Sequence, residues 1–409
     1  MSGPLRVLTL EAAQKILEKF WHIRQHVEEA SLEGAGGRIL AEKIVSKIDV
    51  PPFDRAAVDG YAVRAVDTFG ADEDTPRRLT CAATIRAGDK QRLKLGKRQC
   101  AEIATGAPIP AGASAVVMIE YAVQRDDIVE VCRAVSPGEN VAKRGSEIKR
   151  GTKVFLAGSE LSPSAIGTLV AIGIRKVKVY RRPRIAVISS GAELAKAGVK
   201  LSYGQVHDIN GPTLCEVVKA CGGEPLYLGI ALDEAPHIKA LVRRGLAGCD
   251  AVIISGGSSA GIGDIAPSVV DGLGEPGVIV HGLAMKPGKP TFIAIVRGKP
   301  VFGLPGYPVS ALMVFGQLVA PYIRRMAGMR LLAKLVMRAK LSRKILSARG
   351  RRELVPVKLV RKGGELLAEP LLKGSGAITA LYMADGHVEV PLEQEIVDEG
   401  EIVDVVILR

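Results

Sequence analysis

From Arg184 to Pro308 the sequence alternates short runs rich in β-branched residues with longer amphipathic stretches. The short runs predict strands and the longer stretches predict helices. The five predicted strands are RIAVIS, EPLYLGI, DAVIIS, TFIAIV and PVFGL. Strands that alternate with helices form βαβ units, so we predict an α/β domain built on a mostly parallel sheet.

Glycine-rich loops follow the predicted strands of this domain. Ligands of open α/β sheets bind beyond the carboxyl ends of the strands, so these loops are the candidate binding site. They are SGAE after RIAVIS, HDINGP further along, GGSSAGIGD after DAVIIS, and PGYP after PVFGL. Glycine lets backbone N–H groups approach a ligand, and helix N-termini add positive potential, so such loops bind oxyanions. The candidate ligand-binding residues are Asp208, Asn210, Ser255, Gly256, Gly257, Ser258, Gly261, Pro305 and Gly306.

The segment MKPGKP adds positive charge to the same domain. Lys286 and Lys289 lie in a stiff turn flanked by proline, where they provide point charges for phosphate or another oxyanion. A single glycine-rich loop is explained as well by a tight turn. Four such loops at one edge of one sheet favour a site for a phosphate-bearing anion.

Four acidic residues fall near predicted junctions of strands and helices: Glu193, Asp208, Asp233 and Asp264. Each of them suits a helix N-cap. Carboxylates beside a polyphosphate also hold Mg²⁺, which prefers one or two carboxylates together with phosphate oxygens. Magnesium-assisted phosphoryl or nucleotidyl transfer would use this arrangement, and both interpretations stay open.

One motif argues for a different class of protein. Residues 261–266 match the GxGxxA pattern of dinucleotide-binding domains. The motif lies several residues past its strand, and Glu275, the nearest acidic candidate downstream, lies in a GEPG turn. The acidic residue expected ~20 positions on at a strand end is therefore missing, which argues against a dehydrogenase.

The rest of the chain divides into further domains. The segment IDVPPFDRAAVDGYAV interrupts the helical periodicity, and short runs punctuated by turns follow it. A long tail again alternates apolar and polar residues. We predict an elongated linker domain (1–50 plus 144–180), an inserted β domain (51–143), the α/β domain (181–330) and a C-terminal β domain (331–409).

Composition limits the classes of partner. The net charge is +13, yet aromatic residues are only 4%, so stacking surfaces for nucleic acid are scarce. The six cysteines form no CxxC pair, which argues against a zinc site or a disulfide framework. No apolar run reaches the ~18 residues that cross a bilayer, and MSGPLRVLTLEAAQKI is not a signal peptide. We expect a cytoplasmic protein with a thermophile-like charged surface.

Eight motifs occur in a fixed order along the chain. They are FDRAAVDGYAV, TGAPIPAGASAVVMIE, PGENVAKRGSEI, VISSGAEL, GQVHDINGP, VIISGGSSAGIGD, MKPGKP and GLPGYPVSA. Over essentially its full length the chain resembles the MoeA family of molybdopterin molybdenumtransferases, which includes the E domain of gephyrin. The resemblance implies a four-domain elongated homodimer. It also implies that adenylylated molybdopterin and molybdate, or tungstate, give molybdenum cofactor and AMP with the help of Mg²⁺.

The resemblance also assigns roles to individual residues. The implied catalytic residues are Asp59, Thr105, Glu193, Asp264, Lys286 and Lys289. The implied metal-binding residues are Asp233, Asp264 and Glu147. Ser375 in KGSG corresponds to a contact from the C-terminal domain, and Asp59 is expected to act across the dimer.

The chain departs from the family pattern at four positions. Ala192 replaces a carboxylate in SGAEL, Ile209 replaces a hydroxyl residue, Tyr307 replaces an amide in LPGYP, and Ala56 replaces a serine. These departures bear on the selectivity for the metal oxyanion more than on the class of reaction. Two alternative functions remain: adenylylation of molybdopterin, and a non-catalytic scaffold or nucleic-acid binder that uses the basic segment 324–352.

Overall fold

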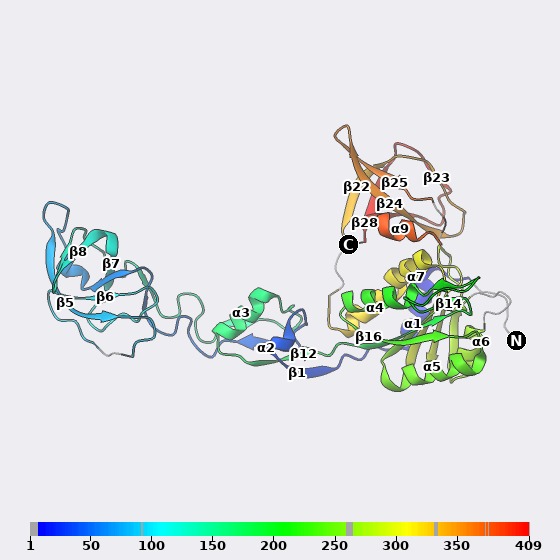
Figure 1. Cartoon of the computed structure of the whole chain (residues 1–409), viewed down its shortest axis with the longest axis horizontal. Coiled ribbons are helices and arrows are strands. Elements are labelled where there is room, and N and C mark those ends of the chain that lie inside the picture. The colour runs from blue at the N-terminus through cyan, green and yellow to red at the C-terminus, as the bar shows by residue number, and fades with distance from the viewer. Residues whose placement is uncertain are drawn as a thin grey trace. The chain divides into compact units, whose positions relative to one another are not determined.

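The computed structural model describes residues 7–90, 93–258, 265–330, 334–372, 374 and 376–408. The chain divides into two compact units. The first unit comprises Met1–Glu29, Gly37–Ala41 and Lys178–Arg409, and the second comprises Ala30–Gly36 and Glu42–Val177. Figure 1 colours the elements of both units along the chain.

The first unit contains an α/β domain whose described strands form a six-stranded sheet. In sheet order these strands are β16 (Glu224–Ala231), β13 (Arg184–Ser190), β17 (Ala251–Ser255), β21 (Lys299–Leu304), β20 (Phe292–Val296) and β18 (Pro276–His281). Strands β16, β13, β17 and β21 are parallel, whereas β20 is antiparallel to both of its neighbours. The prediction of a mostly parallel sheet is therefore confirmed.

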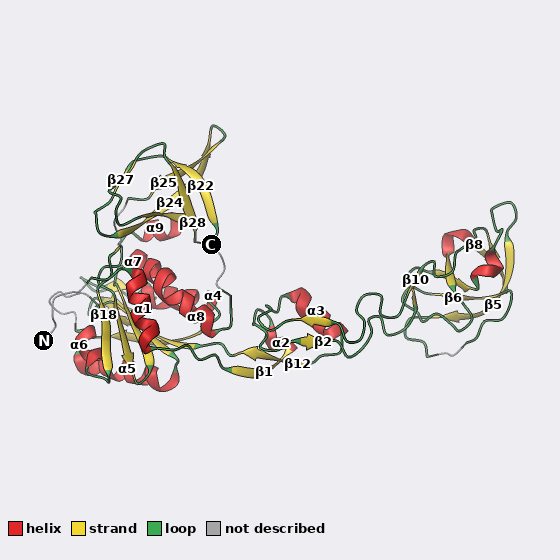
Figure 2. Cartoon of the chain, turned by 180° about the vertical axis from the view of Figure 1, so that it is seen from behind, coloured by secondary structure: helices red, strands yellow, loops and turns green. Residues whose placement is uncertain are grey.

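Helices cover both faces of this sheet (Figure 2). One face packs against α1 (Leu10–Phe20), α4 (Asn210–Ala220), α7 (Pro308–Val314), the π-helical turn η3 (Phe315–Val319) and α8 (Ala320–Met326). The other face packs against α5 (Ala235–Gly248) and α6 (Ala266–Asp271). Along β13, Ile185 and Val187 enter the first core and Ala186 and Ile188 enter the second. Because both faces are buried, the strand is apolar throughout rather than alternating.

Helix α1 begins where the sequence places an N-cap. The Thr9 side chain accepts a hydrogen bond from the backbone N–H of Ala12, 3.2 Å away. Leu10, Ala13 and Leu17 then lie on one face and are buried in the core of the α/β domain. The structure thus groups this helix with the α/β sheet and not with the predicted linker domain (1–50 plus 144–180).

The C-terminal domain is a closed barrel, in agreement with the predicted β domain. Its strands are β22 (Val336–Leu341), β24 (Arg352–Lys362), β25 (Glu365–Pro370), β26 (Gly386–Val390) and β28 (Ile402–Ile407). The pairing of β24 with β26 closes the ring, and β19 (Met285–Lys286) of the α/β domain adds to the edge of β24. Short strands β23 (Ile345–Leu346) and β27 (Ile396–Val397) and helix α9 (Ile378–Met383) complete this domain.

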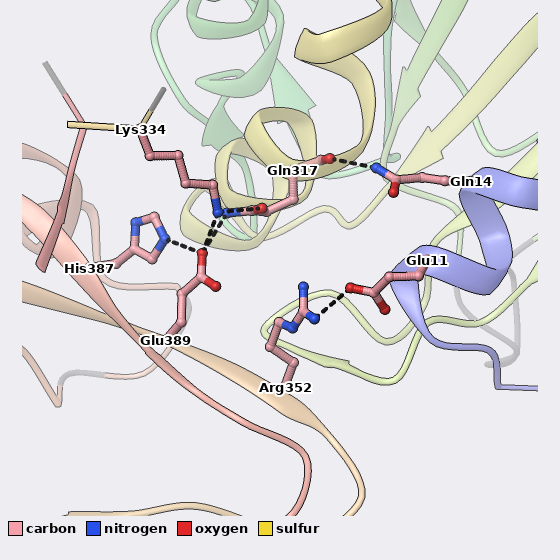
Figure 3. Close-up of polar contacts among 7 residues, drawn as sticks. All are labelled: Glu11, Gln14, Gln317, Lys334, Arg352, His387 and Glu389. Atoms are coloured by element: carbon pink, nitrogen blue, oxygen red, sulfur yellow. Dashed lines mark hydrogen bonds and ion pairs between the residues drawn. The ribbon is translucent and has the colours of Figure 1, made fainter. Parts of the chain in front are cut away.

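The barrel packs directly on the α/β domain. Leu354 and Ala380 of the C-terminal domain are buried in the same core as α1 and α7. Polar contacts surround this apolar junction and are drawn in Figure 3. There Glu389 contacts Lys334 Nζ at 2.6 Å, Gln317 Nε2 at 3.3 Å and His387 Nε2 at 3.4 Å.

The second unit is a β domain joined to a smaller α/β segment. The described strands of the β domain form one sheet: β7 (Ala115–Met118), β4 (Gly60–Val63), β6 (Gln99–Ile103), β5 (Arg77–Ile85), β9 (Ile128–Val131) and β8 (Ala122–Arg125). Two 3₁₀ turns, η1 (Ala65–Thr68) and η2 (Ile119–Tyr121), connect them. The smaller elements are α2 (Leu32–Ala35), α3 (Pro163–Ala171), and the paired strands β2 (Ile44–Val45) with β11 (Lys153–Phe155) and β3 (Arg55–Ala56) with β10 (Val141–Ala142). Boundaries between the two units fall within β1 (Val27–Ser31) and β12 (Lys176–Tyr180).

Candidate active site

A pocket of about 620 Å³ lies at the carboxyl edge of the parallel strands. The loops that follow β13, β17 and β21 line it, together with β15 (Val206–His207) and the start of α4. A short parallel pairing of β15 with β14 (Leu194–Ala195) holds two of these loops together. The predicted site residues that line this pocket are Glu193, Asp208, Asn210, Asp233, Ser255, Gly256, Gly257, Ser258, Pro305 and Gly306.

Close approach of the backbone shapes the floor of the pocket. Gly256 follows β17 with a φ of 96°, and a Cβ at this position would lie 2.0 Å from the carbonyl oxygen of Ser190. No side chain fits there, so the glycine is required by geometry as well as by its backbone conformation. This confirms that the loops after β13 and β17 meet at the carboxyl edge.

Asn210 joins three of the loops. Its Nδ2 donates to Ser255 Oγ at 2.8 Å and to the carbonyl oxygen of Gly306 at 2.7 Å. Ser255 Oγ in turn donates to the carbonyl oxygen of Pro305 at 3.1 Å. Asn210, Ser255 and Pro305 are buried, so the network fixes the loops after β17 and β21 against the first turn of α4.

Asp208 holds the start of α4 rather than leaving its carboxylate free. Its oxygens accept hydrogen bonds from Ser189 Oγ at 2.8 Å, from the Gly211 backbone N–H at 3.1 Å and from the Tyr227 hydroxyl at 2.5 Å. The contact with Gly211 satisfies a backbone N–H in the first turn of α4, from the residue that precedes the N-cap residue Ile209. Burial and then the neighbouring carboxylate raise the pKa of Tyr227, which keeps this hydroxyl protonated as a donor.

Asp233 and Glu193 face the same pocket in different ways. Asp233 accepts from Ser190 Oγ at 3.0 Å and from the Ala192 backbone N–H at 3.1 Å, so it orders the loop after β13. Glu193 is exposed, and its side chain makes no hydrogen bond or ion pair within the described part of the chain. Glu193 is therefore the carboxylate of this loop that is available to a ligand.

Among the described residues no three acidic, histidine or cysteine side chains gather as a ready metal site. Asp264 and Gly261, and likewise Ser375, lie outside the described residues. The carboxylates of Glu193 and Asp233 both line the pocket, and Mg²⁺ needs only one or two carboxylates when phosphate oxygens and water complete its shell. The donor set thus fits Mg²⁺ bound together with a phosphate-bearing ligand.

The two predicted anion-binding lysines do not line the pocket. Lys286 Nζ forms an ion pair with Glu353 Oε1 at 2.9 Å, which ties β19 to the C-terminal barrel. Lys289 is half-buried next to Pro290, which does line the pocket. The described pocket walls therefore contain no lysine or arginine, and an anion bound there would depend on backbone N–H groups and serine hydroxyls.

Several lining residues are not among the predicted site residues. Gly376 and Ile378 come from the C-terminal domain, so this domain forms part of the pocket wall. Tyr307, noted from the sequence only as a departure, lines the pocket with 63% of its surface exposed. Tyr227 belongs to β16 and acts through Asp208, a contact that no local spacing predicts.

The remaining predicted site residues belong to the second unit. Asp59 precedes β4, and its Oδ1 accepts a hydrogen bond from the Thr105 backbone N–H at 2.7 Å. The structure thus brings these two predicted residues together. Glu147 contacts Arg55 Nη2 at 3.2 Å, and both side chains are exposed.

An α/β domain with a carboxyl-edge pocket lined by glycine and serine loops defines a class of anion-binding proteins. Residues 186–325 match the family model of a probable molybdopterin-binding domain. Residues 8–173 match the MoeA N-terminal region (domains I and II), and residues 338–408 match the MoeA C-terminal region (domain IV). The chain belongs to the MoeA family.

Full-length relatives agree with this assignment. A molybdopterin molybdenumtransferase of a Nostoc species is 36% identical over 75% of this chain and 71% of its own length. Molybdopterin molybdenumtransferase 2 of Mycobacterium tuberculosis is 33% identical over 82% of this chain and 84% of its own length. The crystal structure of a molybdopterin biosynthesis MoeA protein from Pyrococcus horikoshii is 44% identical, covers 99% of this chain and 100% of its own chain, and superposes with a TM-score of 0.83. None of the described helices is both long and apolar enough to cross a membrane.

Proposed function

We propose that this protein is a molybdopterin molybdenumtransferase that inserts molybdate, or tungstate, into adenylylated molybdopterin and releases AMP. Membership of the MoeA family and the names of its relatives support this activity. The single observation that carries the substrate class is the pocket of about 620 Å³. Its walls combine serine hydroxyls and glycine backbone with apolar side chains such as Val206, Ile209 and Tyr307, as a ligand with both phosphate groups and a ring system requires.

The proposed reaction is hydrolysis of a phosphoanhydride coupled to loading of the metal. Water forms a new bond to one phosphorus, the bond from that phosphorus to the bridging oxygen breaks, and AMP leaves. Glu193 would orient this water or the oxyanion, because its carboxylate has no hydrogen-bond or ion-pair partner among the described residues. Asn210 and Asp208 hold the surrounding loops in place and need not touch the reacting atoms.

Mg²⁺ would be held by Glu193, Asp233 and Asp264 together with phosphate oxygens, and it would neutralise charge on the phosphoanhydride. We assign Lys286 and Lys289 a supporting role in anion attraction, since neither lines the described pocket. We also propose that Asp59 and Thr105 contribute to the reaction in a homodimer. The Asp59–Thr105 contact would keep that carboxylate ordered and acceptor-ready.

The central test measures AMP released from adenylylated molybdopterin by the pure protein with Mg²⁺, with and without molybdate. Release that depends on Glu193, with a rate about 100-fold lower in Glu193→Gln, is the expected result for a group that positions the water. The exposed Glu216→Gln, on α4 and outside the pocket, is the matched control and should behave as the wild type. Absence of AMP release by the wild-type protein would overturn the proposal.

The homodimer and the role of Asp59 can be tested together. A mixture of Asp59→Asn and Glu193→Gln proteins should regain activity if two chains share residues, whereas each variant alone should keep only its low residual rate. Sedimentation of the wild-type protein would give the number of chains directly. A monomer, or a mixture with no regained activity, would refute the shared site.

Consumption of ATP with unmodified molybdopterin would instead assign the adenylylation reaction. The scaffold alternative depended on free positive charge in the segment 324–352. In the structure several of its cations are paired: Lys334 with Glu389, Lys340 with Glu365, Lys344 with Asp398 and Arg352 with Glu11. These ion pairs leave fewer cations for a polyanion and support the charged, thermophile-like surface instead.

A further inference from the structure

A second pocket of about 510 Å³ lies at the amino edge of the same sheet. Asp250 directly precedes β17, and the turn Arg297–Gly298 directly precedes β21, so this edge is opposite to the candidate active site. The end of α1 and the segment after it form the other wall. We call it the amino-edge pocket; its lining residues are Lys19, Phe20, Trp21, His22, Arg24, His26, Asp250, Arg297, Gly298, Lys299 and Met326.

The amino-edge pocket carries an excess of positive charge. Lys19, Arg24 and Arg297 line it and form no ion pair with any described carboxylate. The one lining carboxylate, Asp250, is already neutralised: Arg181 Nη2 contacts both of its oxygens, at 2.8 and 3.0 Å. Lys299 is also occupied, because its Nζ donates to two carbonyl oxygens at the end of α5. Lys19, Arg24 and Arg297 thus have no described carboxylate partner, and Lys19 Nζ lies over the Phe20 ring, 5.8 Å from its centroid.

The position of Arg297 is unusual for its residue type. Arg297 and Gly298 form the two-residue turn between β20 and β21, with φ values of 52° and 75°. Such turns need a positive φ at both positions, which asparagine and glycine adopt readily and arginine does not. The strained backbone places this arginine in the walls of both the amino-edge pocket and a smaller hollow of about 290 Å³ beside it, which adds Arg243. Backbone strain of this kind clusters at functional sites, and in this chain Arg98 of the β domain, with a φ of 55°, shows it as well.

Aromatic rings complete the wall. Phe20 is 45% exposed although α1 is otherwise anchored in the core. Trp21 follows it and is fixed against Tyr322, with ring centroids 5.7 Å apart. An exposed ring beside unpaired cations suits a ligand with a planar, apolar body and several negative charges.

We propose that the amino-edge pocket binds a nucleoside di- or triphosphate. The phosphates contact Lys19, Arg24 and Arg297, and the base lies against Phe20. The site is separate from the candidate active site, since the two pockets share no lining residue. Occupancy of this pocket does not depend on the transferase reaction.

Trp21 provides a direct test, because it is the only tryptophan of the chain and lies in this pocket. Titration of the full-length protein with ADP and with ATP, each with Mg²⁺, should change its fluorescence in a saturable way. Arg297→Glu and Arg24→Glu should each weaken the apparent affinity about tenfold or more, since charge-assisted hydrogen bonds are lost. Arg361→Glu, an identical charge change at an exposed site of the C-terminal barrel, is the matched control and should leave the affinity unchanged.

Two further measurements separate the parts of the proposal. Arg297→Gly relieves the turn and keeps the fold, so a loss of affinity in this variant supports a role for the guanidinium rather than damage to the structure. Phe20→Ala should weaken the binding of ADP but not that of inorganic tripolyphosphate.

No fluorescence change with either nucleotide, or equal affinity of the Arg24 and Arg297 variants and the wild type, would overturn the proposal. Equal affinity for tripolyphosphate and ATP would overturn the role of the base. AMP release at the other pocket should continue in all of these variants, so the failure of one proposal is distinguishable from the failure of the other.

Discussion

Asp208 is 6% exposed, and its carboxylate accepts three hydrogen bonds. Replacing it with alanine leaves Ser189 Oγ, the Gly211 N–H and the Tyr227 hydroxyl without an acceptor. Each hydrogen bond to a charged group contributes about 1.5–3 kcal/mol. Relief of the desolvation of the buried carboxylate and entry of water offset part of this loss. We therefore expect Asp208→Ala to lower the free energy of unfolding by about 3–5 kcal/mol.

Guanidinium unfolding followed by Trp21 fluorescence measures this effect, because Trp21 and Asp208 belong to the same compact unit. Asp208→Asn is the control: its amide oxygen still accepts from the serine and the backbone, and its N–H₂ can donate to the Tyr227 oxygen. This control variant should lower the free energy of unfolding by about 1–2 kcal/mol. Asp208→Ala should also weaken AMP binding, because the first turn of α4 forms part of the pocket. A change below about 1 kcal/mol for Asp208→Ala would refute the reasoning.

The other predictions follow from single contacts. Gly256→Ala should abolish ligand binding and lower stability by several kcal/mol, as measured by calorimetry and unfolding, because its Cβ would meet the Ser190 carbonyl at 2.0 Å. The hydrogen bond from His387 and the nearby Lys334 lower the pKa of Glu389 to about 2, from 4.5. This depressed pKa contributes stability that is complete above about pH 4.5 and is lost as the pH falls towards 2, so unfolding should become easier over that range in the wild type and less so in Glu389→Gln. Burial raises the pKa of Cys100 to about 12, so mass spectrometry after alkylation at neutral pH should find it unmodified in the folded protein.

Local patterns predicted the strands and the position of the pocket. RIAVIS and DAVIIS are buried on both faces, as their continuous apolar character indicated, and the loops after them do meet at the carboxyl edge. The short spacing between TFIAIV and PVFGL is also consistent with the antiparallel pairing of β20 and β21, since a two-residue turn cannot join parallel strands.

These local patterns could not predict contacts between residues that lie far apart in the sequence. The apolar face of α1 indicates a helix that packs on something, but nothing local shows that its partner is the sheet that begins at Arg184. Lys286 illustrates the same limit. Its neighbours in MKPGKP predict an anion site, whereas the fold places Glu353 within 2.9 Å of its ammonium group. Charged residues in a loop thus predict a binding site less well than backbone geometry does, because long side chains can form ion pairs with residues that are distant in the sequence.

The contribution of the C-terminal domain to the pocket wall has a thermodynamic consequence. Gly376 and Ile378 line the pocket, while the contacts of Figure 3 fasten the barrel to the α/β domain. Suppose that a ligand binds more tightly when the barrel is packed on the α/β domain. Ligand binding must then favour this packed state by the same factor by which packing increases the affinity for the ligand. The barrel junction is then an adjustable determinant of affinity: weakening the Glu389 contacts should raise the dissociation constant without altering any group in the α/β part of the wall.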